Sequence, residues 1–179
     1  MATLGKWVII YQLRRRRYVN RANAEGLVMP QSLANVAVHL VFSTMNRQPF
    51  LADDELRGEM HKQLGGASKT LACPPLIVGG VEDHVHLLGR MSRSITISEW
   101  VKELKRVTSI WIKQREPKLA EFQWQSGYGA FSVSQSETER VVTYIENQRE
   151  HHRQRDFKAE FRLLLERHEI EFDERYVWD

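Results

Sequence analysis

Gly80-Val81-Glu82-Asp83-His84-Val85-His86-Leu87-Leu88 is a glycine bend followed by a strand with a repeated histidine. Because successive strand side chains point to opposite faces, His84 and His86 are expected on the same face. Neutral imidazoles are common ligands of divalent metals, and a strand holds its ligands rigidly. The segment therefore predicts a strand and half of a metal site. An incidental pair of histidines remains open on this triplet alone.

The elements around this segment follow an order that indicates a fold class. Alternating apolar residues predict strands, while helical spacing and the capping pairs Thr96/Glu99 and Ser136/Glu139 predict helices. The expected elements are a strand at 36–43, a helix from 53 that ends at Gly65-Gly66, strands at 76–78 and 84–90, a helix from 96 that ends before Pro117, a strand at 127–133, a helix from 136 through Gln148, and a helix at 157–165. This order predicts an α+β, ferredoxin-like (split βαβ) antiparallel sheet with helices on one face, plus a C-terminal catalytic helix and tail.

Composition limits the class of protein further. The chain has 179 residues, of which 42% are hydrophobic and 27% are charged, as expected for one globular domain. Cys73 is the single cysteine, which excludes an internal disulfide framework and agrees with a cytoplasmic location. No apolar run approaches the roughly 20 residues that cross a bilayer. We therefore expect no membrane partner.

The first 28 residues differ in charge from the rest of the chain. They hold six basic residues and one acidic residue, whereas the remainder holds 20 basic and 22 acidic residues. One interpretation is a basic arm that touches phosphates. The favoured interpretation is a non-native or disordered extension from a misplaced start codon, with Met29-Pro30 as the natural beginning. Residues 29–179 then form a single domain.

A second segment offers chemistry that complements the histidines. Tyr144 and Gln148 are four residues apart on an expected helix and therefore share a face. With two histidines, they could form a metal site in which Tyr144 is the nucleophile and Gln148 supplies an oxygen. Alternatively, Tyr144 is a half-buried helix residue and Gln148 a solvated one. His39 is expected to face the core or the sheet surface without a special role.

The expected helix near residues 96–116 carries a concentration of positive charge. Residues 90–118 contain eight basic and three acidic residues, together with Trp100 and Trp111. The two tryptophans could stack on unpaired bases, but the favoured interpretation is that they belong to the apolar stripe of the helix. The basic side chains could follow DNA phosphates, or they could simply form a solvated face. The candidate DNA-binding residues are Arg93, Lys102, Lys105, Arg106 and Lys113.

Several linked motifs, in order, resemble the HUH-superfamily single-tyrosine transposases of bacterial insertion sequences and of related repeat-associated elements. The resemblance runs from about Met29 to Asp179. The segments that carry it are Val38-His39-Leu40-Val41-Phe42-Ser43-Thr44, Asp83-His84-Val85-His86-Leu87-Leu88, Trp124 through Val133, Tyr144-Ile145-Glu146-Asn147-Gln148-Arg149-Glu150-His151-His152, and the tail Asp173 through Asp179.

This resemblance implies a metal-dependent transposase that nicks and rejoins single-stranded DNA. It implies Mg²⁺ or Mn²⁺ held by His84, His86 and Gln148, and Tyr144 as the nucleophile that forms a 5′-phosphotyrosine. It further implies a homodimer that binds single-stranded or hairpin DNA in the bacterial cytoplasm. A domesticated or non-catalytic nucleic-acid-binding module on the same fold is the main alternative, and a metal hydrolase that activates water is another.

Overall fold

The structure is a computed structural model that describes residues 33–152, 156–175, 177 and 178, without the side chains of residues 151 and 152. The chain divides into two compact units, Met1–Ala34 and Asn35–Asp179. The predicted extension at residues 1–28 lies outside the described residues. All the helices and strands of the described residues lie in the unit that begins at Asn35.

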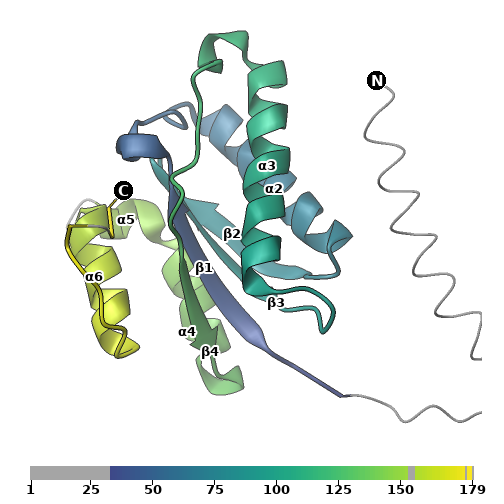
Figure 1. Ribbon diagram of the computed structural model, residues 1–179, viewed down its shortest axis with the longest axis vertical. Coiled ribbons are helices and arrows are strands. Elements are labelled where there is room, and N and C mark those ends of the chain that lie inside the picture. Colours follow the sequence, from purple (N-terminus) through teal and green to yellow (C-terminus); the bar gives the residue numbers. More distant parts are fainter. Residues whose placement is uncertain (1–32, 153–155, 176, 179) are drawn as a thin grey trace, which may run out of the picture. The chain divides into compact units, whose positions relative to one another are not determined.

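The order of elements confirms the predicted ferredoxin-like plan (Figure 1). The main elements follow the order βαββαβ, and three further α-helices follow β4 in the described part of the chain. The elements are β1 (Ala37–Ser43), the 3-10 helix η1 (Met45–Arg47), α2 (Asp54–Thr70), β2 (Pro75–Gly80), β3 (His84–Arg90), α3 (Ile97–Arg115), η2 (Pro117–Leu119), β4 (Gly129–Val133), η3 (Gln135–Glu137), α4 (Thr138–Glu146), α5 (Gln148–His152) and α6 (Phe157–Arg167).

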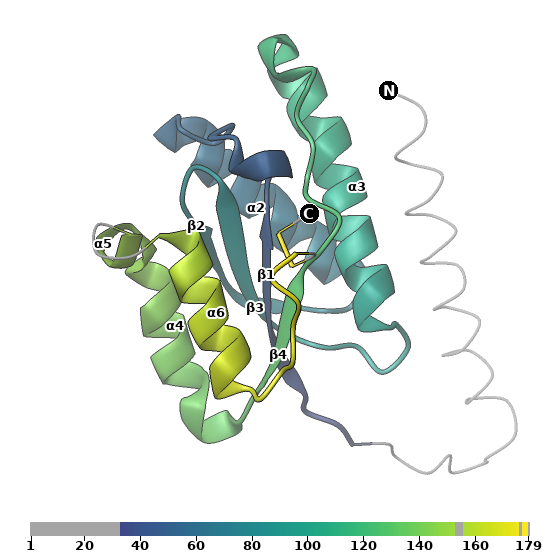
Figure 2. The ribbon, with the colours of Figure 1, turned by 60° about the vertical axis from the view of Figure 1, so that its left-hand side comes forward.

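The four strands form one sheet in the order β2-β3-β1-β4, with every pair antiparallel. The central pair sets Val41 opposite His86 and Ser43 opposite His84. Helices α2 and α3 cover one face of the sheet, as predicted (Figure 2). The C-terminal helices cover the other face, so the histidines of β3 are enclosed between the sheet and these helices.

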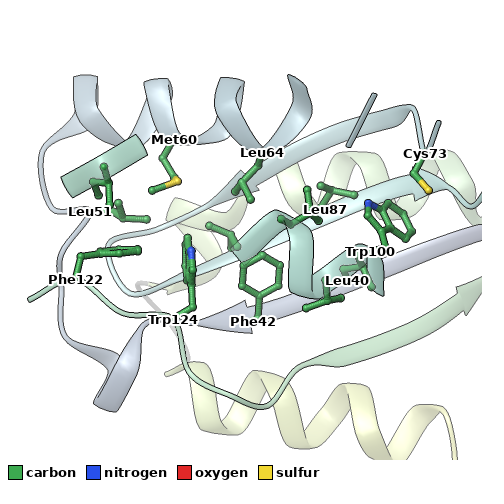
Figure 3. Close-up of a cluster of buried hydrophobic side chains, with 14 of the residues drawn as sticks. Leu40, Phe42, Leu51, Met60, Leu64, Cys73, Leu87, Trp100, Phe122 and Trp124 are labelled. Carbon is green, nitrogen blue, oxygen red and sulfur yellow. The ribbon is translucent and has the colours of Figure 1, made fainter. Parts of the chain in front are cut away.

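The larger hydrophobic core lies between the sheet and the α2–α3 layer (Figure 3). Its buried polar groups are satisfied: the indole N–H of Trp100 donates to Ser68 Oγ at 3.0 Å, and that of Trp124 donates to Thr108 Oγ1 at 2.9 Å. Trp111 packs against the same core. The two tryptophans of α3 are therefore core residues, as the apolar stripe predicts.

Three local predictions need comment. The Thr96/Glu99 capping box is present at the start of α3, whereas the Ser136/Glu139 box is wrong, because η3 occupies residues 135–137 and α4 has no side-chain cap. The predicted end of a helix at Gly65-Gly66 is also wrong, and α2 continues to Thr70. Ser68 stays buried on the line of Met60 and Leu64, and this packing outweighs the cost of helical glycine, about 1 kcal/mol per residue.

Two glycines at the end of β2 determine where the C-terminal helices lie. A Cβ on Gly79 would meet Ile145 Cγ2 at 2.7 Å and Ile145 O at 2.8 Å, so only glycine lets α4 approach β2 this closely. Gly80 has a φ of 140°, which glycine adopts without strain, and it turns the chain toward β3. This glycine pair therefore brings the helix of Tyr144 onto the strand of the histidines.

None of the described helices combines the length and the apolar character needed to cross a membrane.

Candidate active site

His84 and His86 lie on one face of β3, as the alternation of the strand predicts. Both side chains are fully buried. Their Nε2 atoms face the same carboxylate, that of Glu160 on α6: His84 Nε2 lies 3.7 Å from Oε2, and His86 Nε2 lies 3.6 Å from Oε1. The histidine pair is thus part of a buried cluster and not an incidental surface feature.

Glu160 is the residue at which the C-terminal helices meet the sheet. It is 7% exposed and lies between Phe157 and Phe161 on the buried side of α6. The Tyr144 hydroxyl donates a hydrogen bond to Glu160 Oε1, and Gln148 Nε2 donates to the same oxygen at 2.9 Å. The structure therefore brings together the four predicted site residues and adds a carboxylate.

The predicted single helix through Gln148 is wrong in one respect. The helix is interrupted at Asn147, between α4 and α5, where the backbone N–H of Asn147 donates a hydrogen bond to Thr143 O. Tyr144 and Gln148 nevertheless contact the same Glu160 oxygen. The break leaves their shared orientation intact.

The donor atoms fit a divalent cation. One ligand atom from each of His84, His86 and Glu160 lies within 4.8 Å of the others. Gln148 is 1% exposed, and its Oε1 has no hydrogen-bond partner among the described residues. A buried acceptor without a donor calls for an explanation, and a cation ligated by this oxygen would supply one. Imidazole, carboxylate and amide oxygen together suit a divalent ion of the first transition row or Mg²⁺.

Two further side chains fix the orientation of the imidazoles. His84 Nδ1 lies 2.7 Å from Asp83 Oδ1, and His86 Nδ1 lies 2.9 Å from His39 Nε2. With the proton on Nδ1 in both cases, each Nε2 keeps its lone pair for a metal. For His84 this tautomer follows from its partner, since an aspartate carboxylate can only accept. For His86 it is the tautomer in which neutral His39 is the acceptor.

His39 therefore does more than the sequence predicted. It is 3% exposed, stacks on His86 with ring centroids 5.1 Å apart, and lies edge-on to Tyr144 at 6.3 Å. Burial lowers the pKa of His39 to about 4, so the ring is neutral near pH 7 and can accept from His86. The role of His39 depends on its contact with His86 on the neighbouring strand, 47 residues away in sequence. A local sequence pattern does not show such a contact.

The environment of Tyr144 keeps its hydroxyl protonated at neutral pH. Burial raises the pKa of Tyr144 well above its usual value, and the negative charge of Glu160 raises it further. A nucleophilic tyrosine must lose this proton as it attacks. Glu160 accepts the hydrogen bond from the hydroxyl and is therefore placed to receive the proton.

The predicted DNA-binding residues lie apart from this cluster. Lys102, Arg106 and Lys113 are exposed on α3, in the layer on the other face of the sheet, and Arg93 is exposed just before that helix. Arg106 forms an ion pair with Glu103. Lys105 differs from the others: its Nζ donates to the carbonyls of residues 125, 126 and 127 at 2.7, 3.1 and 2.7 Å, and burial lowers its pKa to about 8.

A ferredoxin-like sheet with a histidine pair that faces a helix carrying a tyrosine is the arrangement of the HUH single-tyrosine transposases. This arrangement defines the class of the protein. The family described as "Transposase IS200 like" matches residues 32–148, and the chain belongs to this family. Glu160 lies beyond the matched segment.

Solved structures share the fold. One is a candidate transposase from Deinococcus radiodurans R1, with 23% identity and a TM-score of 0.55, in a match that covers 68% of this chain and 97% of that one. Another is a REP-associated tyrosine transposase bound to a REP hairpin, with 12% identity and a TM-score of 0.51, covering 70% of this chain and 73% of that one. No curated protein is significantly similar in sequence.

Proposed function

We propose that this transposase nicks and rejoins single-stranded DNA through a 5′-phosphotyrosine on Tyr144, in a metal-dependent reaction. One observation carries the proposal: the Tyr144 hydroxyl, the Gln148 amide and two imidazoles converge on the buried carboxylate of Glu160. A nucleophile, a proton acceptor and a set of metal donors in one place are what such a reaction needs.

The residues that would hold Mg²⁺ or Mn²⁺ are His84, His86 and Gln148, with Glu160 as a fourth donor. The chemistry that a bound divalent cation supplies at such a site is polarisation of the scissile phosphate and neutralisation of its developing charge. Asp83 and His39 orient the two imidazoles for this purpose.

The covalent step follows from the contacts of Tyr144. The phenolic oxygen attacks phosphorus while its proton passes to Glu160. The new bond joins Tyr144 to the 5′-phosphate, and the bond from phosphorus to the 3′-oxygen breaks. That oxygen takes up the proton and leaves as a 3′-hydroxyl. In the reverse direction, a 3′-hydroxyl attacks the phosphotyrosine and reseals a strand without external energy, because the number of phosphate ester bonds is conserved.

Other parts of the proposal concern partners. The solved relative bound to a REP hairpin supports hairpin DNA as a partner of this chain. We propose contacts to its phosphates from the basic residues of the α3 region: Arg93, Lys102, Lys105, Arg106 and Lys113. Lys105 contributes least, because its ammonium already donates to three carbonyls. A homodimer, a cytoplasmic location and a domain at residues 29–179 belong to the same proposal.

Replacement of the nucleophile tests the proposal. Tyr144→Phe removes the attacking oxygen, so the covalent protein–DNA adduct should vanish while DNA binding stays near wild type. The substrate is the 3′-labelled single-stranded flanks of the gene with Mn²⁺, and adducts are detected on denaturing gels. Thr143→Val, which removes the hydroxyl of an exposed neighbour on the same helix, is the matched control and should retain the adduct. An adduct that persists in Tyr144→Phe contradicts the assignment.

The same assay separates the alternatives. A non-catalytic binding module forms no adduct with any variant, and a hydrolase that activates water cleaves DNA without Tyr144. The double variant His84→Ala, His86→Ala should lose metal-dependent cleavage. Full cleavage by the wild type in chelator would contradict the metal requirement.

A further inference from the structure

A pocket opens beside the histidine cluster where β1 extends past β4. Val41 of β1 pairs with Gly129 of β4, and the next bridge joins Thr44 to Trp124. Between these two pairs the chain advances three residues on the β1 side and five residues on the β4 side. Two extra residues therefore bulge from the sheet, as in other β-bulges that re-aim side chains near active sites. Lys105 Nζ fixes this bulge through its three carbonyl bonds.

The pocket has a volume of about 300 Å³, which lies at the lower end for sites that hold small organic groups. Ser43, in its wall, pairs with His84 across the strands. Phe157, which also lines the pocket, has its ring centroid 4.6 Å from that of His84. A group bound in the pocket would therefore adjoin the proposed position of the scissile phosphate.

Gln125 supplies a buried polar group in the wall of the pocket. The residue is 7% exposed, and its Oε1 is buried with no hydrogen-bond partner among the described residues. Its Nε2 donates to the carbonyl oxygen of Trp178 at 3.2 Å, which fixes the orientation of the amide. Buried acceptors in proteins are nearly always satisfied. Gln125 lines the pocket, so an N–H donor bound there would supply the partner that this oxygen lacks.

The remaining walls are aromatic and basic. Tyr128, Phe157 and Trp178 provide ring surfaces, and Arg47 and Lys158 provide positive charge. Lys158 Nζ lies 5.0 Å from the ring centroid of Trp178. Aromatic rings for stacking, combined with cations for the phosphate backbone, are the means by which proteins bind unpaired bases.

We infer that this pocket binds one unpaired DNA base next to the scissile phosphate, with Gln125 Oε1 accepting a hydrogen bond from the amino or imino group of the base. The inference rests on the proposed single-stranded DNA substrate and adds a subsite to it. Enzymes that modify a nucleobase hold it unpaired in a pocket lined by aromatic side chains, and the same contacts suit an unpaired base beside a cleavage site.

Binding to single strands of equal charge tests the inference without any cleavage. The probes are fluorescein-labelled dodecamers of dA, dC and dT and an abasic dodecamer with the same phosphates, measured by anisotropy in EDTA. Wild type should bind at least one base-containing strand about tenfold more tightly than the abasic strand, the size expected for one stacked base. Gln125→Leu should lose most of this preference, because the N–H of the bound base would be buried without an acceptor. Gln123→Leu, at an exposed neighbouring position, should retain it.

The outcomes separate this inference from the proposed function. If folded Gln125→Leu keeps the preference, or if wild type binds base-containing and abasic strands equally, the inference is overturned while the Tyr144 chemistry stands. If wild type binds none of the strands, the inference is overturned, and the adduct assay on the flanks of the gene decides the proposed function. Should Gln125→Leu fail to fold by circular dichroism, Trp178→Ala decides, because it removes a ring of the same pocket from the C-terminal tail.

Discussion

Glu160→Gln separates the role of the Glu160 charge from its role in packing. The substitution keeps the shape of the side chain and leaves a carbonyl oxygen for Tyr144 and Gln148. It removes the negative charge that faces the Nε2 atoms of His84 and His86. Without metal, a carboxylate that is 7% exposed is costly to bury, so the variant should be at least as stable as wild type.

The expected difference in stability between wild type and Glu160→Gln appears when a divalent cation is added. Altering outer partners of metal ligands weakens binding about 10–100-fold, and we take about 100-fold for a direct carboxylate donor. At a cation concentration about 100 times the wild-type Kd, wild type gains about 2.7 kcal/mol and the variant about 0.4 kcal/mol. The difference of about 2.3 kcal/mol corresponds to roughly 5–9 °C in Tm for a chain of this size.

Thermal unfolding followed by circular dichroism, with MnCl₂ titrated from zero, measures this difference. Glu166→Gln is the matched control, because it makes the same change at an exposed position on the same helix. The control should show the wild-type rise in Tm with Mn²⁺. An equal rise in Glu160→Gln would refute Glu160 as a metal donor, whatever its effect on cleavage.

Further predictions concern the surroundings of the site. His39→Phe should weaken Mn²⁺ binding by about 10–100-fold in calorimetry, because His86 loses the acceptor that fixes its tautomer; unchanged affinity would show that His39 only packs. Gly79→Ala should destabilise the protein by about 1–3 kcal/mol in urea unfolding, since its Cβ meets Ile145, whereas Gly66→Ala, with open space, should be neutral or stabilising. Burial and the positive charge of Arg57 lower the pKa of His61 to about 4 in the folded protein. In the unfolded chain the same imidazole has its ordinary pKa of about 6.5, so below that pH the unfolded state binds a proton that the folded state does not. Stability should therefore fall between pH 7 and pH 5, with about 2 kcal/mol of the loss absent in His61→Gln, and an identical pH profile in that variant would contradict the shift.

The sequence predicts the sheet and most of the site because their signals are local. Alternation places His84 and His86 on one face, and helical spacing aligns Tyr144 with Gln148. The helix end at Gly65-Gly66 fails because tertiary packing of Ser68 and Leu64 overrides the propensity of glycine.

Glu160 is absent from the sequence prediction although a signal for it exists. It occupies a position on the apolar stripe formed by Phe157, Phe161 and Leu164, where an acidic residue is rarely buried without a partner. That signal says only that the carboxylate needs partners. Its partners lie on β3 and α4, and only the fold shows which they are. The same holds for His39 and for the Gln125 pocket, which depends on a register shift between strands.

The enclosure of the histidines by the last helices has a consequence for synthesis of the protein. The sheet is complete once the chain reaches Val133, while Glu160 and the walls of the pocket contributed by Phe157 and Trp178 come later. Domains begin to fold while the ribosome is still adding residues, at roughly 5–20 residues per second. We expect a nascent chain to expose the imidazoles of His84 and His86 before Glu160, whose carboxylate completes the set of donors, has been synthesised. Under the proposed function, the ability to cut DNA would then arise only after the helix that carries Glu160 has been synthesised.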